Sequence, residues 1–199
     1  MESMGGGMNF WQGRRVRLRS IEPEDGDFLY ALSQDTEAQK GVIATIAPPK
    51  SLAACKKEAQ EASLKRPSDD AFQLVIENEA GEPIGLINSH GIRRRPRVFG
   101  YGLQVLREHR RKGYAREAAV LFLRYFFDML GYQKCNTAVF SFNEPSARLH
   151  ESLGFVREGC RRRTEFVDGR YHDCWSYGIT VEEFHAKHGG PTVESGGGA

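Results

Sequence analysis

The most constraining feature of this sequence is a basic loop between two apolar segments whose hydrophobic residues recur at different spacings. Residues 107–118 read REHRRKGYAREA. The preceding segment Phe99–Val105 is typical of a strand, whereas Glu117–Leu130 carries apolar residues at helical spacing. The first N–H groups of a helix have no partner within it and carry the positive end of its dipole. The pattern therefore predicts an anion-binding site at a strand–loop–helix junction.

The composition is that of a globular protein. Of the 199 residues, 40% are hydrophobic and 27% are charged, which does not favour disorder. We expect one folded domain over residues 9–188, between flexible tails at residues 1–8 and 189–199 that are rich in glycine. The formal net charge of +2 favours no particular partner, so the clustering of the arginines carries more information.

The sequence also limits the compartment and the cofactors that we expect. It contains no apolar run near the roughly 20 residues that span a bilayer, and its N-terminus does not resemble a signal peptide. We therefore predict a cytoplasmic protein without a membrane partner. The four cysteines form no C-x-x-C pair, which favours reduced thiols over a disulfide framework or a zinc site, and no metal is expected.

The first half of the chain alternates between the two periods. Arg15–Arg19 predicts a strand, and a helix should follow from Ser20 or Glu22, with Pro23 in its first turn. Ser51 should cap a second helix. The residues expected on the buried faces of these two helices are Phe28, Leu29, Leu32, Leu52, Cys55, Ala59 and Ala62.

From residue 71 onward, the period of two predicts three strands before the basic loop. Later segments predict a strand over Lys134–Phe140, a helix that begins at Asn143 and ends before Gly154, and a hairpin around Asp168-Gly169. The hairpin strands are expected over residues 160–167 and 170–179. This order of elements indicates a mixed α+β protein with helices on the faces of one sheet.

The basic loop is suited to a pyrophosphate. Gly113 and Ala115 leave room for backbone N–H groups to approach a phosphate, and Arg110, Arg111 and Lys112 add positive charge. Neither G-x-x-x-x-G-K-[ST] nor G-x-G-x-x-G is present, so the loop is not one of those nucleotide motifs. The alternative is a solvated basic turn before an ordinary helix.

A second candidate site lies on the helix that Asn143 should cap. Ser146 and His150 are one turn apart and share a helix face. An imidazole there could exchange protons near neutral pH. The alternative is structural, with Asn143 and Ser146 completing the first turn and His150 packed or solvated.

These residues resemble a known family. Arg110–Ala115 matches the [QR]-x-x-G-x-[GA] signature of the GNAT N-acyltransferase superfamily, and Asn143–Phe155 is similar to its later N-x-x-[SA] helix that ends in L-G-F. The residue sequence of Gly113–Ala118, together with Glu158-Gly159 and Asp168–Asp173, looks most like the ribosomal-protein N-terminal acetyltransferase branch. The resemblance covers residues 16–179.

The resemblance implies a splayed, mostly antiparallel sheet and acetyl-CoA as the co-substrate. The strands Tyr101–Val105 and Lys134–Phe140 would part to admit the pantetheine arm. The residues that the resemblance assigns to acetyl-CoA are Leu103 and Val105 through their backbone, Arg110, Arg111, Lys112, Gly113, Tyr114 and Ala115 around the pyrophosphate, and Asn143 with Ser146 beside the arm.

The resemblance also implies direct transfer, in which a neutral amine attacks the thioester while a base and an acid move protons. Many relatives have a tyrosine acid where this chain has His150, which makes His150 the leading acid candidate, followed by Ser146 and Tyr101. The Glu that the branch often carries before its Gly-Tyr is replaced here. The base is therefore His90, which shares a strand face with Asn88, or a water relay.

The acceptor is a primary amine, either a protein N-terminus or a small molecule. An α-amine with a pKa near ~7.8 is roughly one-tenth neutral at pH 7, whereas a lysine is almost fully charged, so a weak base favours the α-amine. The acceptor should lie near loops 41–49 and 93–97. Nucleic acid would be met only indirectly, through ribosomal proteins, and a homodimer is allowed but not required.

Two alternatives remain from other functional classes. The first is a non-catalytic domain that binds or senses acetyl-CoA. The second is an RNA-associated basic protein, which the arginines of 93–97 and 161–163 suggest, although no aromatic platform accompanies them.

Overall fold

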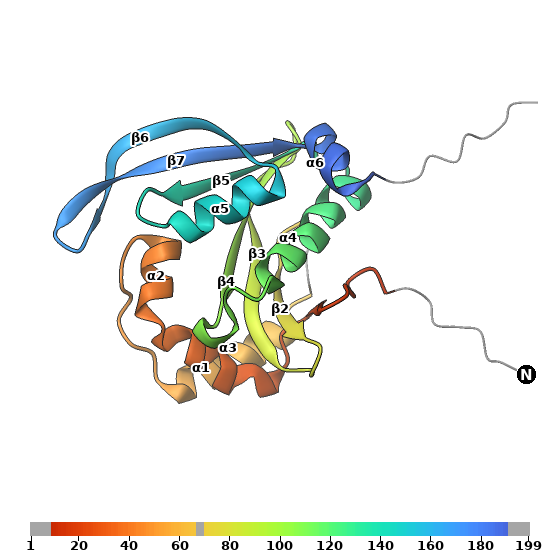
Figure 1. Cartoon of the computed structure of the whole chain (residues 1–199). Helices are drawn as coiled ribbons and strands as arrows, with labels where there is room; N and C mark the ends of the chain where they lie inside the picture. The colour runs from red at the N-terminus through yellow and green to blue at the C-terminus, as the bar shows by residue number, and fades with distance from the viewer. Residues whose placement is uncertain (1–8, 67–69, 191–199) are drawn as a thin grey trace, which may run out of the picture.

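The computed structural model describes residues 9–66 and 70–190 and shows a seven-stranded sheet flanked by helices (Figure 1). The predicted tail at residues 1–8, and residues 191–199 of the other, lie outside the described residues. The elements are β1 (Val16–Arg19), a 3-10 turn (Pro23–Asp25), α1 (Gly26–Gln34), α2 (Thr36–Ile43), α3 (Leu52–Ser63), β2 (Gln73–Asn78), β3 (Pro83–Arg93), β4 (Val98–Val105), a 3-10 turn (Arg107–His109), α4 (Tyr114–Arg124), a π-turn (Tyr125–Met129), β5 (Lys134–Phe140), α5 (Glu144–Leu153), β6 (Val156–Val167), β7 (Arg170–Thr180) and α6 (Val181–His188).

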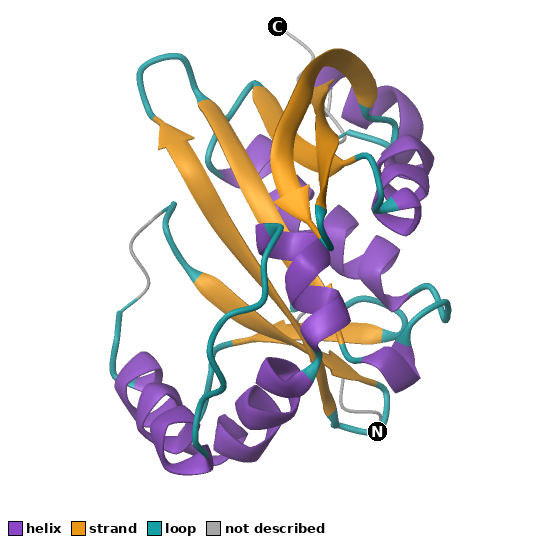
Figure 2. Ribbon diagram, turned by 90° about the vertical axis from the view of Figure 1, so that its left-hand side faces the viewer, coloured by secondary structure: helices purple, strands orange, loops and turns teal. Residues whose placement is uncertain are grey.

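The strand order is β1-β2-β3-β4-β5-β7-β6, and among the described strands β4 and β5 form the single parallel pair. Helices cover both faces of this sheet (Figure 2). On one face, Phe28 and Leu32 of α1 pack with Val75 of β2. On the other face, Phe122 of α4 packs in the larger core that contains Tyr101. The predicted mixed α+β class with a mostly antiparallel sheet is confirmed.

Local signals placed several element ends correctly. The hydroxyl of Ser51 accepts a hydrogen bond from the Ala54 N–H at 3.1 Å and begins α3. Gly154, with φ of 102°, ends α5 as expected. Asp168 and Gly169 both have positive φ, at 50° and 79°, which the two-residue turn between β6 and β7 requires.

Two helices were missed and two boundaries were wrong. None of the residues of α2 is buried, so it lacks the apolar stripe that reveals a surface helix. Phe184 is the one buried residue of α6. The helix α4 begins at Tyr114 rather than Glu117, because Gly113 is its N-cap, and β6 begins four residues before the predicted Cys160.

The sheet parts between β4 and β5, as predicted. These strands pair at Val98 with Lys134 and at Phe99 with Cys135, whereas β5 pairs with β7 as far as Phe140. The remaining length of β4, Tyr101–Val105, therefore forms one side of an opening that we call the splay. It widens toward the basic loop that follows β4. The arginine-rich turn at residues 94–97 lies at the closed end of the splay, and its place beside the acceptor stays a prediction.

No helix in the described part of the chain is long and apolar enough to cross a membrane.

Candidate active site

The backbone of β4 offers an open edge to the splay. The Leu106 N–H donates to the Ile84 carbonyl at 2.9 Å, in register with the pairs that join β3 and β4. Hydrogen-bonded positions alternate along an antiparallel ladder, so the even-numbered residues of β4 bind β3. The backbone groups of Tyr101 and Leu103 and the N–H of Val105 therefore face the splay, whereas the Val105 carbonyl accepts from Nε of Arg110. This is the edge that the resemblance assigned to pantetheine.

The edge leads directly to the N-terminus of α4. The first intrahelical bond runs from the Glu117 N–H to the Gly113 carbonyl at 3.3 Å, so the N–H groups of residues 114–116 have no acceptor within the helix. Gly113 has a φ of 88° and Arg111 a φ of 60°, which turns the loop tightly around this terminus. Backbone donors and the helix dipole converge there on one small region, as an anion site requires.

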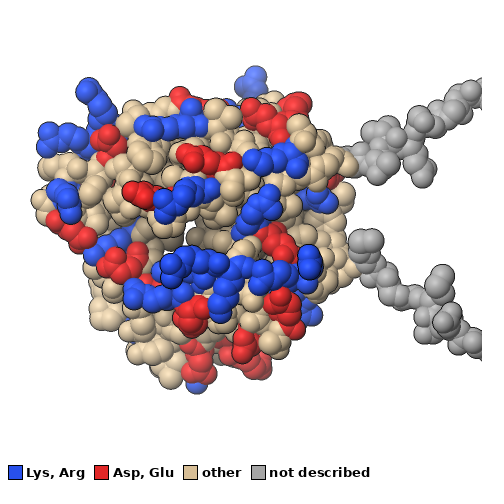
Figure 3. All heavy atoms as spheres, viewed as in Figure 1, with Lys and Arg blue, Asp and Glu red and all other residues tan. Residues whose placement is uncertain are grey.

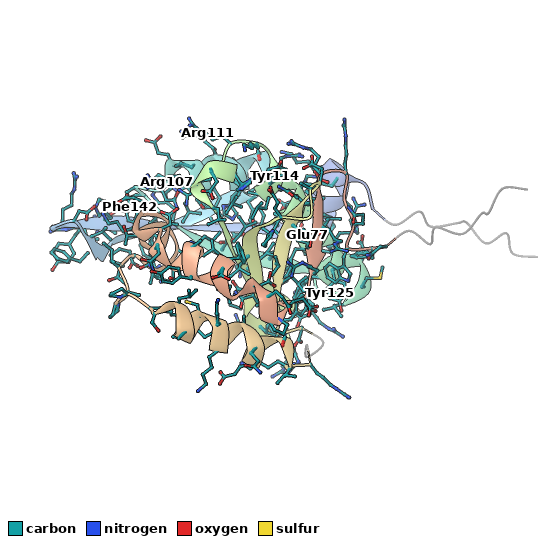
Figure 4. The ribbon with its side chains drawn as sticks, turned by 90° about the horizontal axis from the view of Figure 1, so that it is seen from below. Glu77, Arg107, Arg111, Tyr114, Tyr125 and Phe142 are labelled. Atoms are coloured by element: carbon teal, nitrogen blue, oxygen red, sulfur yellow. The ribbon has the colours of Figure 1, made fainter. Side chains whose placement is uncertain are left out.

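The basic side chains of the loop differ in their availability. Arg111 and Lys112 are exposed, and Figure 4 shows Arg111 near Tyr114 and Arg107. Arg110, in contrast, is half-buried and forms an ion pair with Asp35, while its Nε donates to the Val105 carbonyl at 2.9 Å. The charge of Arg110 is thus paired within the protein, and its contribution to a phosphate site stays a prediction. The hydrogen bond from Arg110 to the Val105 carbonyl holds the loop against the end of β4.

A second arginine, Arg15, directly precedes β1 and supports the loop, although the sequence motifs did not assign it to the site. The guanidinium of Arg15 donates to the Lys112 carbonyl at 2.5 Å and lies 4.7 Å above the ring of Tyr114. The hydroxyl of Tyr114 in turn donates to Glu79 at 3.2 Å. Tyr114 is thus held in the core with its N–H at the helix terminus. The loop is anchored from two sides before any ligand binds.

A buried polar group lies beside the splay, where β4 faces α5. The hydroxyl of Tyr101 is 3.0 Å from Nε2 of His150, whose Nδ1 is 2.8 Å from the Ser146 carbonyl. Burial lowers the pKa of His150, against a smaller opposing effect of that carbonyl, so the imidazole is neutral at pH 7. Its Nδ1 then carries the proton, because a carbonyl can only accept, and Nε2 accepts from Tyr101.

This arrangement brings together three of the four predicted catalytic residues. The hydroxyl of Ser146 lies 3.4 Å from Nδ1 of His150, at the limit of a hydrogen bond. Burial raises the pKa of Tyr101 well above its ordinary value, so this hydroxyl keeps its proton. Both ring nitrogens of the neutral His150 are already engaged. The single proton of the Tyr101 hydroxyl lies in its hydrogen bond to Nε2 of His150.

The fourth residue, His90, lies on the opposite face of the sheet. His90 and Asn88 project from β3 over two glycines of β4: a Cβ added to Gly100 would lie 2.7 Å from Cε1 of His90, and one added to Gly102 would lie 2.9 Å from Oδ1 of Asn88. His90 is exposed, and it is separated by the sheet from the pair of Tyr101 and His150. Its side chain and that pair thus flank β4 from two sides.

Asn143 is used by the protein itself. Its Oδ1 accepts from the Ser146 N–H at 3.2 Å and begins α5, while its Nδ2 donates to the Gly41 carbonyl at 3.0 Å. Gly41 belongs to α2, so the predicted loop at residues 41–49 begins as helix. The contact of Asn143 with a pantetheine arm stays a prediction.

The space-filling view shows a hollow in the middle of the face seen in Figure 1, with Lys and Arg side chains in a row along its lower edge (Figure 3). The hollow lies in the region where β4, α2 and β5 enclose the splay in Figure 1. A positively charged rim suits an entering anionic donor, since it raises the local concentration of anions.

The model of the Acetyltransferase (GNAT) domain matches residues 15–156. The chain belongs to this family. The match includes the splay, the loop after β4 and all of α5, so it contains both sequence motifs and the site that they form. The protein is an N-acetyltransferase, and the GNAT family takes its acetyl group from acetyl-CoA.

Relatives of known sequence support the assignment. The GNAT chain is 38% identical over 182 residues to the SPbeta prophage-derived uncharacterized N-acetyltransferase YokL of Bacillus subtilis, covering 92% of this chain and 99% of that protein. It is 32% identical over 117 residues to the spermidine N(1)-acetyltransferase of Vibrio cholerae, covering 58% and 68%. A Bacillus subtilis protein named for ribosomal N-acetylation, YdaF, is 24% identical over 177 residues, covering 86% and 94%. The ribosomal branch is therefore only weakly indicated.

Solved structures share the fold. A GCN5-related N-acetyltransferase from Brucella melitensis has a TM-score of 0.72 at 30% identity, covering 89% of this chain and 80% of that one. The spermidine N-acetyltransferase from Vibrio cholerae in complex with CoA and spermine has a TM-score of 0.73 at 24% identity, covering 86% and 99%.

Proposed function

We propose that this GNAT chain transfers the acetyl group of acetyl-CoA directly to a primary amine that meets the thioester in the splay. One observation carries the proposal: the open backbone edge of β4 leads directly to the unpaired N–H groups at the start of α4. A donor with amides along its arm and a pyrophosphate at its end matches these two features in that order. The edge would pair with the arm as with an added strand.

The loop supplies the charge for the pyrophosphate. The N–H groups of Gly113, Tyr114 and Ala115 bind its oxygens, and the exposed Arg111 and Lys112 add electrostatic attraction. Asn143 and Ser146 line the arm at the start of α5. Arg110 contributes by shaping the loop, since its side chain is held by Asp35.

The chemistry requires two proton movements. The neutral amine nitrogen forms a bond with the thioester carbon, the carbon–sulfur bond breaks, the nitrogen loses a proton and the thiolate gains one. We propose that His150 positions the Tyr101 hydroxyl and that this hydroxyl leaves its hydrogen bond to Nε2 to donate its proton to the thiolate. The phenolate of Tyr101 then regains a proton from solvent. The amine proton leaves to His90 or through a water relay along backbone carbonyls.

The acceptor is a protein N-terminal amine or a small-molecule amine such as a polyamine. The relatives named for spermidine and for ribosomal acetylation support one class each. The decisive experiment measures thiol release from acetyl-CoA with peptides, amino acids, polyamines and aminoglycosides. We expect release with one class. Tight binding of acetyl-CoA with no release for any amine would instead support the non-catalytic alternative.

A further inference from the structure

The short helix α2 connects the two sides of the splay. In Figure 1 it lies between α1 and the hairpin of β6 and β7, beside the open end of β4. None of its residues is buried, so apolar packing contributes little to its position. Gln39 in the middle of the helix donates to the Ser33 carbonyl at 2.7 Å and accepts from the Ala47 N–H at 2.8 Å, and further polar contacts hold its two ends.

Asp35 holds the first end. One carboxylate oxygen accepts from the Ala38 N–H at 3.0 Å and caps α2, while the other forms the ion pair with Arg110. Arg107 contributes a longer contact, at 3.8 Å. The Asp35 side chain is only 9% exposed. The same carboxylate thus begins α2 and binds the first residue of the donor loop.

The second end rests on the far side of the splay. The Gly41 carbonyl accepts from Nδ2 of Asn143, which caps α5, and Lys40 pairs with Asp168 at the tip of the hairpin at 2.9 Å. A Cβ on Gly41 would lie 2.7 Å from Nδ2 of Asn143, so the approach is close. The helix α2 is therefore attached to the basic loop through Asp35 and to the start of α5 through Asn143.

From these contacts we infer that Asp35 is a positioning residue that couples the donor-binding loop to α2, so that binding of acetyl-CoA orders the helix at the acceptor side. The inference rests on the proposed donor site. Asp35 contacts both the loop and α2, so a ligand that favours one arrangement of the loop also favours the arrangement of α2 that goes with it. The coupling is reciprocal, so an ordered α2 also favours binding of the ligand. Asp35 and Arg110 are far apart in the sequence, so their contact exists only in the folded protein.

Asparagine at position 35 separates the two tasks of the carboxylate. Asparagine caps helices about as well as aspartate, so Asp35→Asn retains the cap of α2. It removes the charge that Arg110 needs, and the half-buried guanidinium must then reorient. Arg110→Gln breaks the same pair from the other side, and Asp35→Glu restores the charge. Asp27→Asn on α1 is the matched control, because its carboxylate is 71% exposed and pairs with Lys56 at 3.5 Å.

The experiment measures acetyl-CoA affinity by calorimetry and hydrogen exchange of residues 36–43 with and without acetyl-CoA. For the wild type we expect exchange in α2 to slow when acetyl-CoA binds. Asp35→Asn and Arg110→Gln should each weaken binding by about 5- to 30-fold and abolish that slowing, and the double variant should be no weaker than the worse single variant. Asp35→Glu should recover part of both effects, and Asp27→Asn should bind within about twofold of the wild type.

The outcomes distinguish the two proposals. If the wild type does not bind acetyl-CoA, the proposed function fails. If the wild type binds and Asp35→Asn binds equally well with the same slowing of exchange in α2, the coupling is overturned while the proposed function stands. A purely structural role would lower the melting temperature of Asp35→Asn and leave the acetyl-CoA-dependent slowing in place, which would also overturn the inference. Should Asp35→Asn fail to fold, Arg110→Gln provides the same readouts.

Discussion

The hydroxyl of Tyr101 lies 3.0 Å from Nε2 of His150, and this hydrogen bond joins β4 to α5 beside the splay. Both side chains are buried, at 3% and 6% exposure. The pair is therefore shielded from solvent. In our proposal, the hydroxyl that many relatives of the GNAT superfamily supply as a tyrosine at position 150 comes here from Tyr101 on the neighbouring strand.

Replacing Tyr101 with phenylalanine removes the proposed acid and keeps the ring. We expect kcat to fall by about 10²- to 10⁴-fold while acetyl-CoA affinity changes little. Steady-state kinetics and calorimetry measure the two quantities. Tyr171→Phe is the control, because that tyrosine is exposed on the hairpin and should leave kcat unchanged. A wild-type kcat in Tyr101→Phe would exclude this role.

The neutral His150 predicts how stability depends on pH. Its pKa is lowered in the fold by burial, so between the ordinary value near 6.5 and the lowered one the unfolded chain binds a proton that the folded protein does not. The stabilising contribution of neutral His150 is complete above pH 6.5 and is lost as the pH falls below it. Urea unfolding from pH 8 to pH 5 should show a steeper loss for the wild type than for His150→Gln.

His188, whose pKa is also lowered by burial, is present in both proteins and cancels from that comparison. Parallel pH curves for the wild type and His150→Gln would contradict a neutral, buried imidazole.

The proposed acetyl-CoA site can be tested by placing a negative charge at position 113. A Cβ there would lie 3.4 Å from Arg15, an ordinary contact, so the positive φ of 88° is the main constraint on substitution. Asparagine tolerates this conformation, and Gly113→Asn should bind acetyl-CoA nearly as well as the wild type. Gly113→Glu places a negative charge beside the pyrophosphate and should weaken binding by at least about tenfold. Equal affinities for both variants in calorimetry would argue against the site.

Asp70 provides a test of stability at the closed end of the splay. Its carboxylate accepts from Arg94 at 2.6 and 2.8 Å and from the Tyr132 hydroxyl at 2.7 Å. Arg94 lowers the pKa of Asp70 against the opposing effect of burial, while burial and Asp70 raise the pKa of Tyr132 to about 12. Asp70→Asn should reduce the free energy of unfolding at pH 7 by about 1–3 kcal/mol.

The sign of the pH effect follows from the lowered pKa. The ionised Asp70 stabilises the fold above its ordinary pKa near 3.9, and this contribution is lost as the pH falls through the lower folded value. The difference between wild type and Asp70→Asn, measured by urea unfolding, should therefore shrink below about pH 4. A difference that is constant from pH 7 to pH 3 would rule out a charge-based contribution.

Sequence reasoning succeeded where a signal is contained within a few residues. Asn143 and Gly154 marked the ends of α5 because a cap and a left-handed residue act on their own helix. It failed for α2, whose cap Asp35 is a valid start signal but whose residues form no apolar stripe. It also missed α6, although Thr180 and Glu183 form a capping box that the sequence displays.

The sequence by itself determined most of the elements and the two motifs, because periodicity, caps and the glycine of the loop act locally. The tertiary structure alone decided which charges are available and which are already paired. It paired Arg110 with Asp35, and it buried His150 against Tyr101, which lowers the pKa of the imidazole. These outcomes depend on residues that are far apart in the chain, and the energies of ionised groups depend on burial and partners that only the folded arrangement creates.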